Sequence, residues 1–133
     1  MKLHTRPVTA PLRGELTPPG DKSISHRSLI FGCLASGETR VDGLLESEDV
    51  RATAAACRQL GMKDRFEGDT LVITGVGEQG LSPPDGELDM GNSGTAIRLL
   101  SGVLAAQPFD SVLTGDESLS QRPMNRIVRP LEQ

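Results

Sequence analysis

The feature that most constrains the fold of this chain is a faint internal repeat. A shift of 70 residues places Ser23 on Ser93, Leu29 on Leu99 and Leu34 on Leu104. In each half a turn rich in small and polar residues comes first, and a helix, a short strand and a second helix are predicted to follow. Repeats with such a period indicate a duplicated α/β unit. Two unrelated helices rich in Leu and Ala would give the same alignment, so both explanations stay open at this point.

Hydrophobic periodicity, capping residues and turn residues predict the individual elements. Helices are expected over 23–37, over 47–61, from 91–95 onward, and from Pro123 to the end of the chain. Strands are expected at 2–6, 12–16, 39–45 and 110–114, and a hairpin joins 63–66 to 70–74. The stretch 75–86 is expected to be a surface loop. The last predicted helix has no Gly stop, as expected of a piece of a longer polypeptide.

Composition argues against several functions. The net charge is −4 and the pI is about 5.1, so the chain has no overall basic field that attracts nucleic acid or anionic membranes. Three Phe and no Trp or Tyr leave few rings on which bases could stack. No stretch approaches the roughly 18 apolar residues of a membrane span, and the first residues lack the apolar run of a signal peptide. We therefore expect a cytoplasmic protein.

The cysteines and histidines do not indicate a metal site. Cys33 and Cys57 lie among apolar residues of predicted helices, so they are predicted to be buried free thiols of a reducing compartment. His26 is predicted to be solvated or to cap its helix. Neither His26 nor His4 has a partner at metal-ligand spacing, so no metal and no other cofactor is expected.

The stretch "PGDKSISHR" (19–27) gathers hydrogen-bond donors at the start of a predicted helix. The first turn of a helix exposes unpaired N–H groups and partial positive charge, which favour a phosphate or carboxylate. Ser23 and Arg27 are four residues apart and share a face, and the ammonium of Lys22 can reach the same anion. The alternative is an ordinary capped helix with a solvated Lys and Arg.

Two further stretches place similar groups before helices. "GNSGT" (91–95) brings Asn92 between glycines, with Arg98 one turn on, and "GDESLSQRPMNR" (115–126) places Arg122 next to a helix-starting Pro. The alternatives are an ordinary tight turn from strand to helix at 91–95 and a surface position for Arg122. Because parallel α/β units bring such helix starts to one edge of a sheet, the three stretches together predict a pocket for a small dianion or two anions. No pair of carboxylates stands out as acid and base, so we expect only part of an active site.

Three longer stretches, "PGDKSISHRSLIFGCLASGET", "DMGNSGTAIRLLSG" and "TGDESLSQRPM", resemble the N-terminal part of the 5-enolpyruvylshikimate-3-phosphate (EPSP) synthases. The resemblance covers essentially the whole chain, whereas the family is several times longer. It implies an α/β (α+β) enolpyruvyl transferase fold of repeated βαβαββ units arranged in two lobes. Residues 1–17 would belong to the lobe that the missing C-terminal part completes, and residues 18–133 would form about two units of an incomplete N-terminal lobe.

The resemblance also implies a function in the shikimate pathway to chorismate and the aromatic amino acids. The family transfers the enolpyruvyl group of phosphoenolpyruvate to the 5-hydroxyl of shikimate 3-phosphate, releases phosphate and needs no metal. Lys22 would be catalytic and lie near both substrates. The shikimate 3-phosphate ligands would be Lys22, Ser23 and Arg27. The phosphoenolpyruvate pocket, which the herbicide glyphosate also fills, would be formed by Lys22, Asn92, Gly94 and Arg122.

The same resemblance places the acid and base groups in the absent lobe. The chain alone is therefore expected to be an inactive fragment whose partner is a complementing C-terminal half. Leu99 stands where many glyphosate-sensitive members have Pro, which leaves glyphosate sensitivity open. The alternatives are a non-catalytic anion-binding half of a split enzyme and a relative of the enolpyruvyl transferase that acts on UDP-N-acetylglucosamine. The latter family has a reactive Cys before the Arg-Pro pair, and "GDESLSQRP" contains none.

Overall fold

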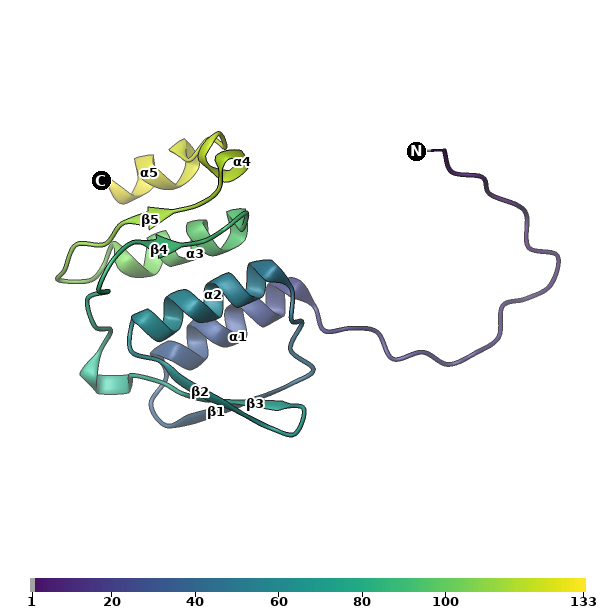
Figure 1. Cartoon of the computed structure of the whole chain (residues 1–133), viewed down its shortest axis with the longest axis horizontal. Helices are drawn as coiled ribbons and strands as arrows, with labels where there is room; N and C mark the ends of the chain where they lie inside the picture. Colours follow the sequence, from purple (N-terminus) through teal and green to yellow (C-terminus); the bar gives the residue numbers. More distant parts are fainter. Residues whose placement is uncertain (1) are drawn as a thin grey trace.

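Two small sheets enclose a layer of helices in the computed structural model, which describes residues 2–133 (Figure 1). The elements follow the order α1 (Lys22–Leu34), β1 (Glu38–Asp42), α2 (Glu48–Gln59), β2 (Lys63–Glu67), β3 (Thr70–Thr74), η1 (Gly77–Gln79), β4 (Leu88–Asp89), α3 (Gly94–Leu104), β5 (Leu113–Thr114), α4 (Glu117–Ser120) and α5 (Asn125–Leu131). This mixture of helices and strands confirms the predicted α/β class. The division into βαβαββ units stays a prediction.

The first sheet is antiparallel, in the order β1-β3-β2, and the second is a parallel pair of β4 and β5. The predicted hairpin is confirmed, since β2 and β3 pair with Lys63 opposite Thr74. Leu71 and Ile73 of β3 point into the core that α1 and α2 cover. In Figure 1, α3 lies between these two helices and the second sheet, so the three long helices fill the space between the two sheets.

A single apolar core joins the three long helices. The side chains of Leu29, Cys57 and Leu100, one from each helix, are at most 1% exposed. Gly32 lets α1 approach β3 closely, because a Cβ there would lie 2.9 Å from Cδ1 of Ile73. The prediction of buried free thiols is confirmed, since Cys33 and Cys57 are both buried and unbridged. The pKa of the Cys57 thiol is raised, mainly by the side-chain hydrogen bond with Cys33 and secondly by burial.

Local capping signals set the starts of the three long helices. The side chain of Asp21 accepts a hydrogen bond from the Ile24 N–H, so α1 begins one residue before the predicted Ser23. Ser47 caps α2 as predicted, and Ser93 caps α3 by accepting from the Ala96 N–H at 3.1 Å. In Figure 1 the first turns of α1, α2 and α3 all lie on the right-hand side of the helix layer.

Residues 2–6 and 12–16 do not form the predicted strands in this chain by itself, and their place in a lobe completed by a C-terminal part stays a prediction. This segment is exposed and forms no strand among the described residues, and Figure 1 shows it running away from the folded part. Leu3, Leu12 and Leu16 are more than four-fifths exposed. An alternating pattern becomes a strand only when a second strand supplies hydrogen-bond partners, and the described part of the chain offers none to this segment.

The C-terminal third differs from the prediction in its details. The short parallel strand β4 and the single-turn helix α4 are too brief to create a periodic signal, and neither was predicted. The strand expected at 110–114 is reduced to Leu113–Thr114. Helix α5 begins at Asn125, so Pro123 precedes the helix instead of lying in its first turn. No helix of the described residues is long and apolar enough to cross a membrane.

Candidate active site

The first turns of α1 and α2 meet through an ion pair. Lys22, the first residue of α1, places its Nζ against Oδ2 of Asp49, in the first turn of α2. The Lys22 side chain is 48% exposed and that of Asp49 is 23% exposed. Asp49 therefore holds the ammonium group at the protein surface. The half-exposed ammonium can still be approached from solvent by a second anion.

The start of α3 brings two arginines close to one backbone turn. Arg98 donates from Nη1 to the Gly94 carbonyl oxygen at 2.8 Å. A Cβ on Gly94 would lie 2.6 Å from Nη1 of Arg98 and 2.9 Å from Nη1 of Arg122. Only a residue without a side chain lets both guanidinium groups approach the start of this helix so closely. Gly91, with φ +54, makes the turn that precedes it.

A hydrogen-bonded chain holds Arg122 in this position. Its Nη2 donates to Oδ1 of Asn92, and Nδ2 of Asn92 donates to the carboxylate of Asp116 at 2.7 and 3.0 Å. Asp116 also caps α4 by accepting from the Leu119 N–H at 2.7 Å. The hydrogen bonds from Asn92 and from the Leu119 backbone, with the charge of Arg122, lower the pKa of the Asp116 carboxyl. The carboxylate thus remains ionised and orients the amide of Asn92 toward Arg122.

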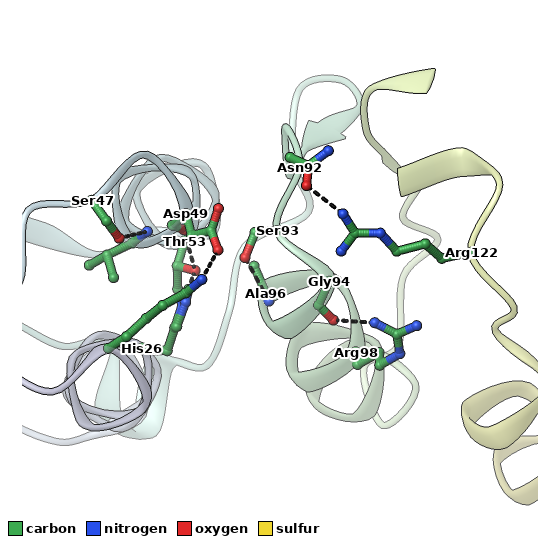
Figure 2. Close-up of polar contacts among 12 residues, drawn as sticks. His26, Ser47, Asp49, Thr53, Asn92, Ser93, Gly94, Ala96, Arg98 and Arg122 are labelled. Carbon is green, nitrogen blue, oxygen red and sulfur yellow. Dashed lines mark hydrogen bonds and ion pairs between the residues drawn. The ribbon is translucent and has the colours of Figure 1, made fainter. Parts of the chain in front are cut away.

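These groups border one hollow of about 410 Å³. Its lining residues are Lys22, Asp49, Gly94, Thr95, Arg98, Leu99 and Arg122. Three cations face one carboxylate, so the hollow favours an anion, and its volume suits a small metabolite. The guanidinium of Arg122 can grip a carboxylate or phosphate with two parallel hydrogen bonds. Figure 2 shows Asp49 and Arg122 on opposite sides of the start of α3.

The structure brings together some, but not all, of the residues predicted for the site. Lys22, Gly94 and Arg122 line the hollow, and Asn92 contacts Arg122 beside it. Ser23 and Arg27 are exposed on α1 and do not line the hollow. Successive helical residues point about 100° apart, so Ser23 lies on a different side of the first turn of α1 from the part of Lys22 that lines the hollow.

Four residues that line the hollow have no role in the predicted site, namely Asp49, Thr95, Arg98 and Leu99. Arg98 was noted one turn into its helix, but its two carbonyl partners, Gly94 and Pro123, come from the folded arrangement. In the sequence, Asp49 is an acidic residue in the first turn of a predicted helix. Acidic residues are common there because they interact favourably with the helix dipole, so this position alone does not indicate a site. In the sequence, Leu99 is part of the internal repeat and a departure from the resembling family, and neither observation assigns it to the site. The proximity of α2 to α1, which pairs Asp49 with Lys22, has no local sequence signal.

The prediction that His26 is solvated or capping is wrong. Its side chain is 0% exposed, and Nδ1 lies 2.7 Å from Oγ1 of Thr53 on α2. His26 lies on the side of α1 that carries Leu29, Ile30 and Cys33, and this side packs into the core. That spacing was a usable signal. Burial, opposed by the charge of Asp49 and reinforced by that of Lys22, lowers the pKa of the imidazole.

A second hollow, of about 640 Å³, lies where the glycine-rich loop after β3 meets the end of α1. The only charged side chain described in its lining is that of Lys63. It offers an anion far less positive charge than the hollow at the helix starts. Across residues 2–133, no three His, Cys, Asp or Glu side chains are grouped so that they could hold a metal ion.

The fold and the hollow define an α/β protein that presents cations and helix starts to a small anion. A family model described as EPSP synthase (3-phosphoshikimate 1-carboxyvinyltransferase) matches residues 7–133, so the chain belongs to the EPSP synthase family. The resemblance seen in the sequence is thereby confirmed. The match does not favour a relative of the UDP-N-acetylglucosamine enzyme.

Individual relatives agree with this assignment. The 3-phosphoshikimate 1-carboxyvinyltransferase of Streptococcus pyogenes serotype M49 (strain NZ131) is 56% identical over all 133 residues, and that of serotype M3 (strain MGAS315) is equally similar. The solved EPSP synthase of Acinetobacter baumannii is 55% identical, with a TM-score of 0.84 over 90% of this chain and 27% of that chain. The chain spans about a third of the length of the S. pyogenes relatives, 31% for serotype M49.

Proposed function

We propose that this chain supplies the N-terminal share of an EPSP synthase site. In the complete site, the enolpyruvyl group of phosphoenolpyruvate is transferred to the 5-hydroxyl of shikimate 3-phosphate, and phosphate is released. The observation that carries the proposal is the convergence of Lys22, Arg98 and Arg122 on one hollow at the start of α3. Both substrates are anions, so a site for both needs such a density of cations and N–H donors.

The proposed roles differ between the two substrates. Lys22 stands between them and is the catalytic residue of this part of the site. The guanidinium of Arg122, the amide of Asn92 and the open backbone at Gly94 form the phosphoenolpyruvate pocket together with Lys22. Ser23 and Arg27, which are exposed on α1, bind shikimate 3-phosphate together with Lys22.

The proposed partner is a C-terminal half that completes the enzyme. Residues 1–17 would form strands within the lobe that this half builds, while residues 18–133 form about two units of the N-terminal lobe. Leu3, Leu12 and Leu16 support this division, since their large apolar side chains are exposed and would be covered by such a lobe. The hollow contains Asp49 as its only carboxylate, and this carboxylate is paired with Lys22, so further proton-transfer groups would come from the partner.

The test compares the chain alone with a joined enzyme, in which residues 1–133 are fused to the remainder of the S. pyogenes serotype M49 relative. Phosphate release is measured with both substrates. Each protein is also expressed in a bacterium that lacks EPSP synthase, and growth is tested on medium without aromatic amino acids. We expect turnover and growth from the joined enzyme and neither from the chain alone. An inactive but folded joined enzyme would contradict the proposed function, and turnover by the chain alone would contradict the division of the site.

A further inference from the structure

Two polar contacts join α1 to α2, one helical turn apart. The outer contact is the ion pair of Lys22 with Asp49, and the inner contact is that of His26 with Thr53. Lys22 and His26 are four residues apart on α1, and Asp49 and Thr53 are four residues apart on α2, so each pair of neighbours shares a helix face. The outer contact borders the hollow, whereas both side chains of the inner contact are 0% exposed.

The hydrogen bonds of Thr53 determine which nitrogen of His26 holds the proton. The hydroxyl of Thr53 has one hydrogen, and its Oγ1 lies 3.3 Å from the carbonyl oxygen of Asp49, which can only accept. Both contacts of Oγ1 are satisfied when Thr53 donates to Asp49 and accepts from Nδ1 of His26. Nδ1 then carries a proton, and burial, which lowers the pKa of the imidazole, favours the neutral ring with this as its one proton. Its Nε2 is buried without a hydrogen-bond partner among the described residues.

A purely structural histidine does not account for this arrangement. Burying an acceptor without a partner is unfavourable, and an apolar side chain of similar size would avoid that penalty. The one polar contact that His26 gains in exchange is with Thr53, whose hydroxyl in turn binds the backbone of Asp49. The contact therefore helps to fix the first turn of α2, and this turn carries Asp49, the counter-ion of Lys22.

We propose that His26 is a positioning residue for Lys22, acting through Thr53 and Asp49. This proposal rests on the proposed function, since it concerns the lysine assigned there to catalysis. The Nδ1–H of His26 fixes the first turn of α2 against α1, and Asp49 then holds the ammonium of Lys22 toward the hollow. Small displacements of a catalytic group are costly in rate, so loss of this contact lowers turnover more than substrate binding.

The first experiment needs no substrate and uses the chain itself. Two-bond ¹H–¹⁵N spectra of the imidazole identify the protonated nitrogen of His26 near neutral pH, with assignment by the His26→Asn variant. The expected result is a neutral ring protonated at Nδ1, with this signature lost in Thr53→Val. A neutral ring protonated at Nε2, or a charged ring, would overturn the proposal whatever the activity of the joined enzyme.

The second experiment measures kcat and KM in the joined enzyme. His26→Leu and Thr53→Val each remove the inner contact and are expected to lower kcat by about tenfold, with KM for both substrates changed by less than about threefold. His26→Asn, whose amide can occupy the position of Nδ1, is expected to recover most of kcat. Ile30→Val is the matched control, because it trims the core one turn along α1 and leaves both polar contacts intact.

The outcomes separate this proposal from the proposed function. Inactivity of the unsubstituted joined enzyme would count against the proposed function alone, because the imidazole spectra do not depend on turnover. If the joined enzyme is active, unchanged kcat in both His26→Leu and Thr53→Val would overturn the positioning role. An equal loss in Ile30→Val would overturn it as well, since that result would assign the effect to packing.

Discussion

Arg98 donates a hydrogen bond of 3.3 Å to the carbonyl oxygen of Pro123, which lies 25 residues further along the chain. Its other terminal nitrogen donates to Gly94 at the start of the same helix. One guanidinium group therefore connects the first turn of α3 to the segment that carries Arg122. The planar guanidinium group of an arginine can donate these two hydrogen bonds in fixed directions, whereas the single ammonium group of a lysine cannot.

Replacing Arg98 by Lys tests this connection while keeping the charge. We expect Arg98→Lys to weaken phosphoenolpyruvate binding in the joined enzyme by about tenfold, because the segment before α5 loses its fixed distance from α3. The measurement is KM for phosphoenolpyruvate together with its affinity by calorimetry. Wild-type values for both would show that charge alone, and not the two-bonded geometry, is what Arg98 contributes.

Gly94 tests whether the approach of the two arginines matters for binding. A Cβ would meet Nη1 of Arg98 at 2.6 Å and Nη1 of Arg122 at 2.9 Å, and both atoms are at the ends of flexible side chains. We therefore expect Gly94→Ala to change the free energy of unfolding by less than about 1 kcal/mol, while phosphoenolpyruvate binding falls by about tenfold or more. Urea unfolding and calorimetry measure the two quantities. A variant that binds normally would mean that the guanidinium groups do not need this position.

Arg122 is the group expected to contribute most to phosphoenolpyruvate binding. Arg122→Ala should weaken that binding in the joined enzyme by a few kcal/mol, about 2–5, if the pair with the substrate is desolvated. The matched control is Arg129→Ala on α5, which removes the same charge from an exposed position outside the hollow. Unchanged saturation by phosphoenolpyruvate in Arg122→Ala, or an equal effect in Arg129→Ala, would remove Arg122 from the site.

The buried imidazole of His26 predicts how stability depends on pH. Its pKa in the folded chain is lowered from 6.5, chiefly by burial, so the unfolded chain binds the proton first as the pH falls. The free energy of unfolding should therefore decrease below about pH 6.5, by at most about 1.4 kcal/mol per pH unit from this group. Urea unfolding of the chain and of His26→Asn gives the difference due to His26, since Asp49, Lys22 and all other groups titrate in both. A difference that does not vary with pH would contradict the lowered pKa.

Local signals predicted the helix starts well, because a cap acts within one turn of the chain. Ser47 accepts from Val50, and Ser93 accepts from Ala96, as their places before apolar stripes indicate. Convergence was predicted for the stretches 19–27, 91–95 and 115–126, because parallel α/β units bring helix starts to one edge of a sheet. The start of α2, which carries Asp49, was not included in that prediction. Lys22 and Arg122 were placed in the site by this reasoning, and Gly94 was placed there by the resemblance to the EPSP synthases.

The failures share a different cause, which is dependence on a distant surface. The alternating residues of 2–6 and 12–16 have no strand to pair with in the described part of the chain, so the pattern alone could not fold them. The spacing of His26 with the apolar residues of α1 indicated burial, but its partner Thr53 depends on the contact of α1 with α2. The pairing of Lys22 with Asp49 depends on the same helix contact, and neither residue type nor spacing reports it.

The central claim is that the helix starts form one binding hollow for a small anion. The most direct measurement is a titration of the isotope-labelled chain with phosphoenolpyruvate, following backbone amide and arginine side-chain N–H shifts. We predict that the largest shifts fall on Gly94, Thr95, Arg98 and Arg122, and that Arg122→Ala abolishes them. Shifts of equal size spread over the surface, or centred on the glycine-rich hollow near Lys63, would contradict the account.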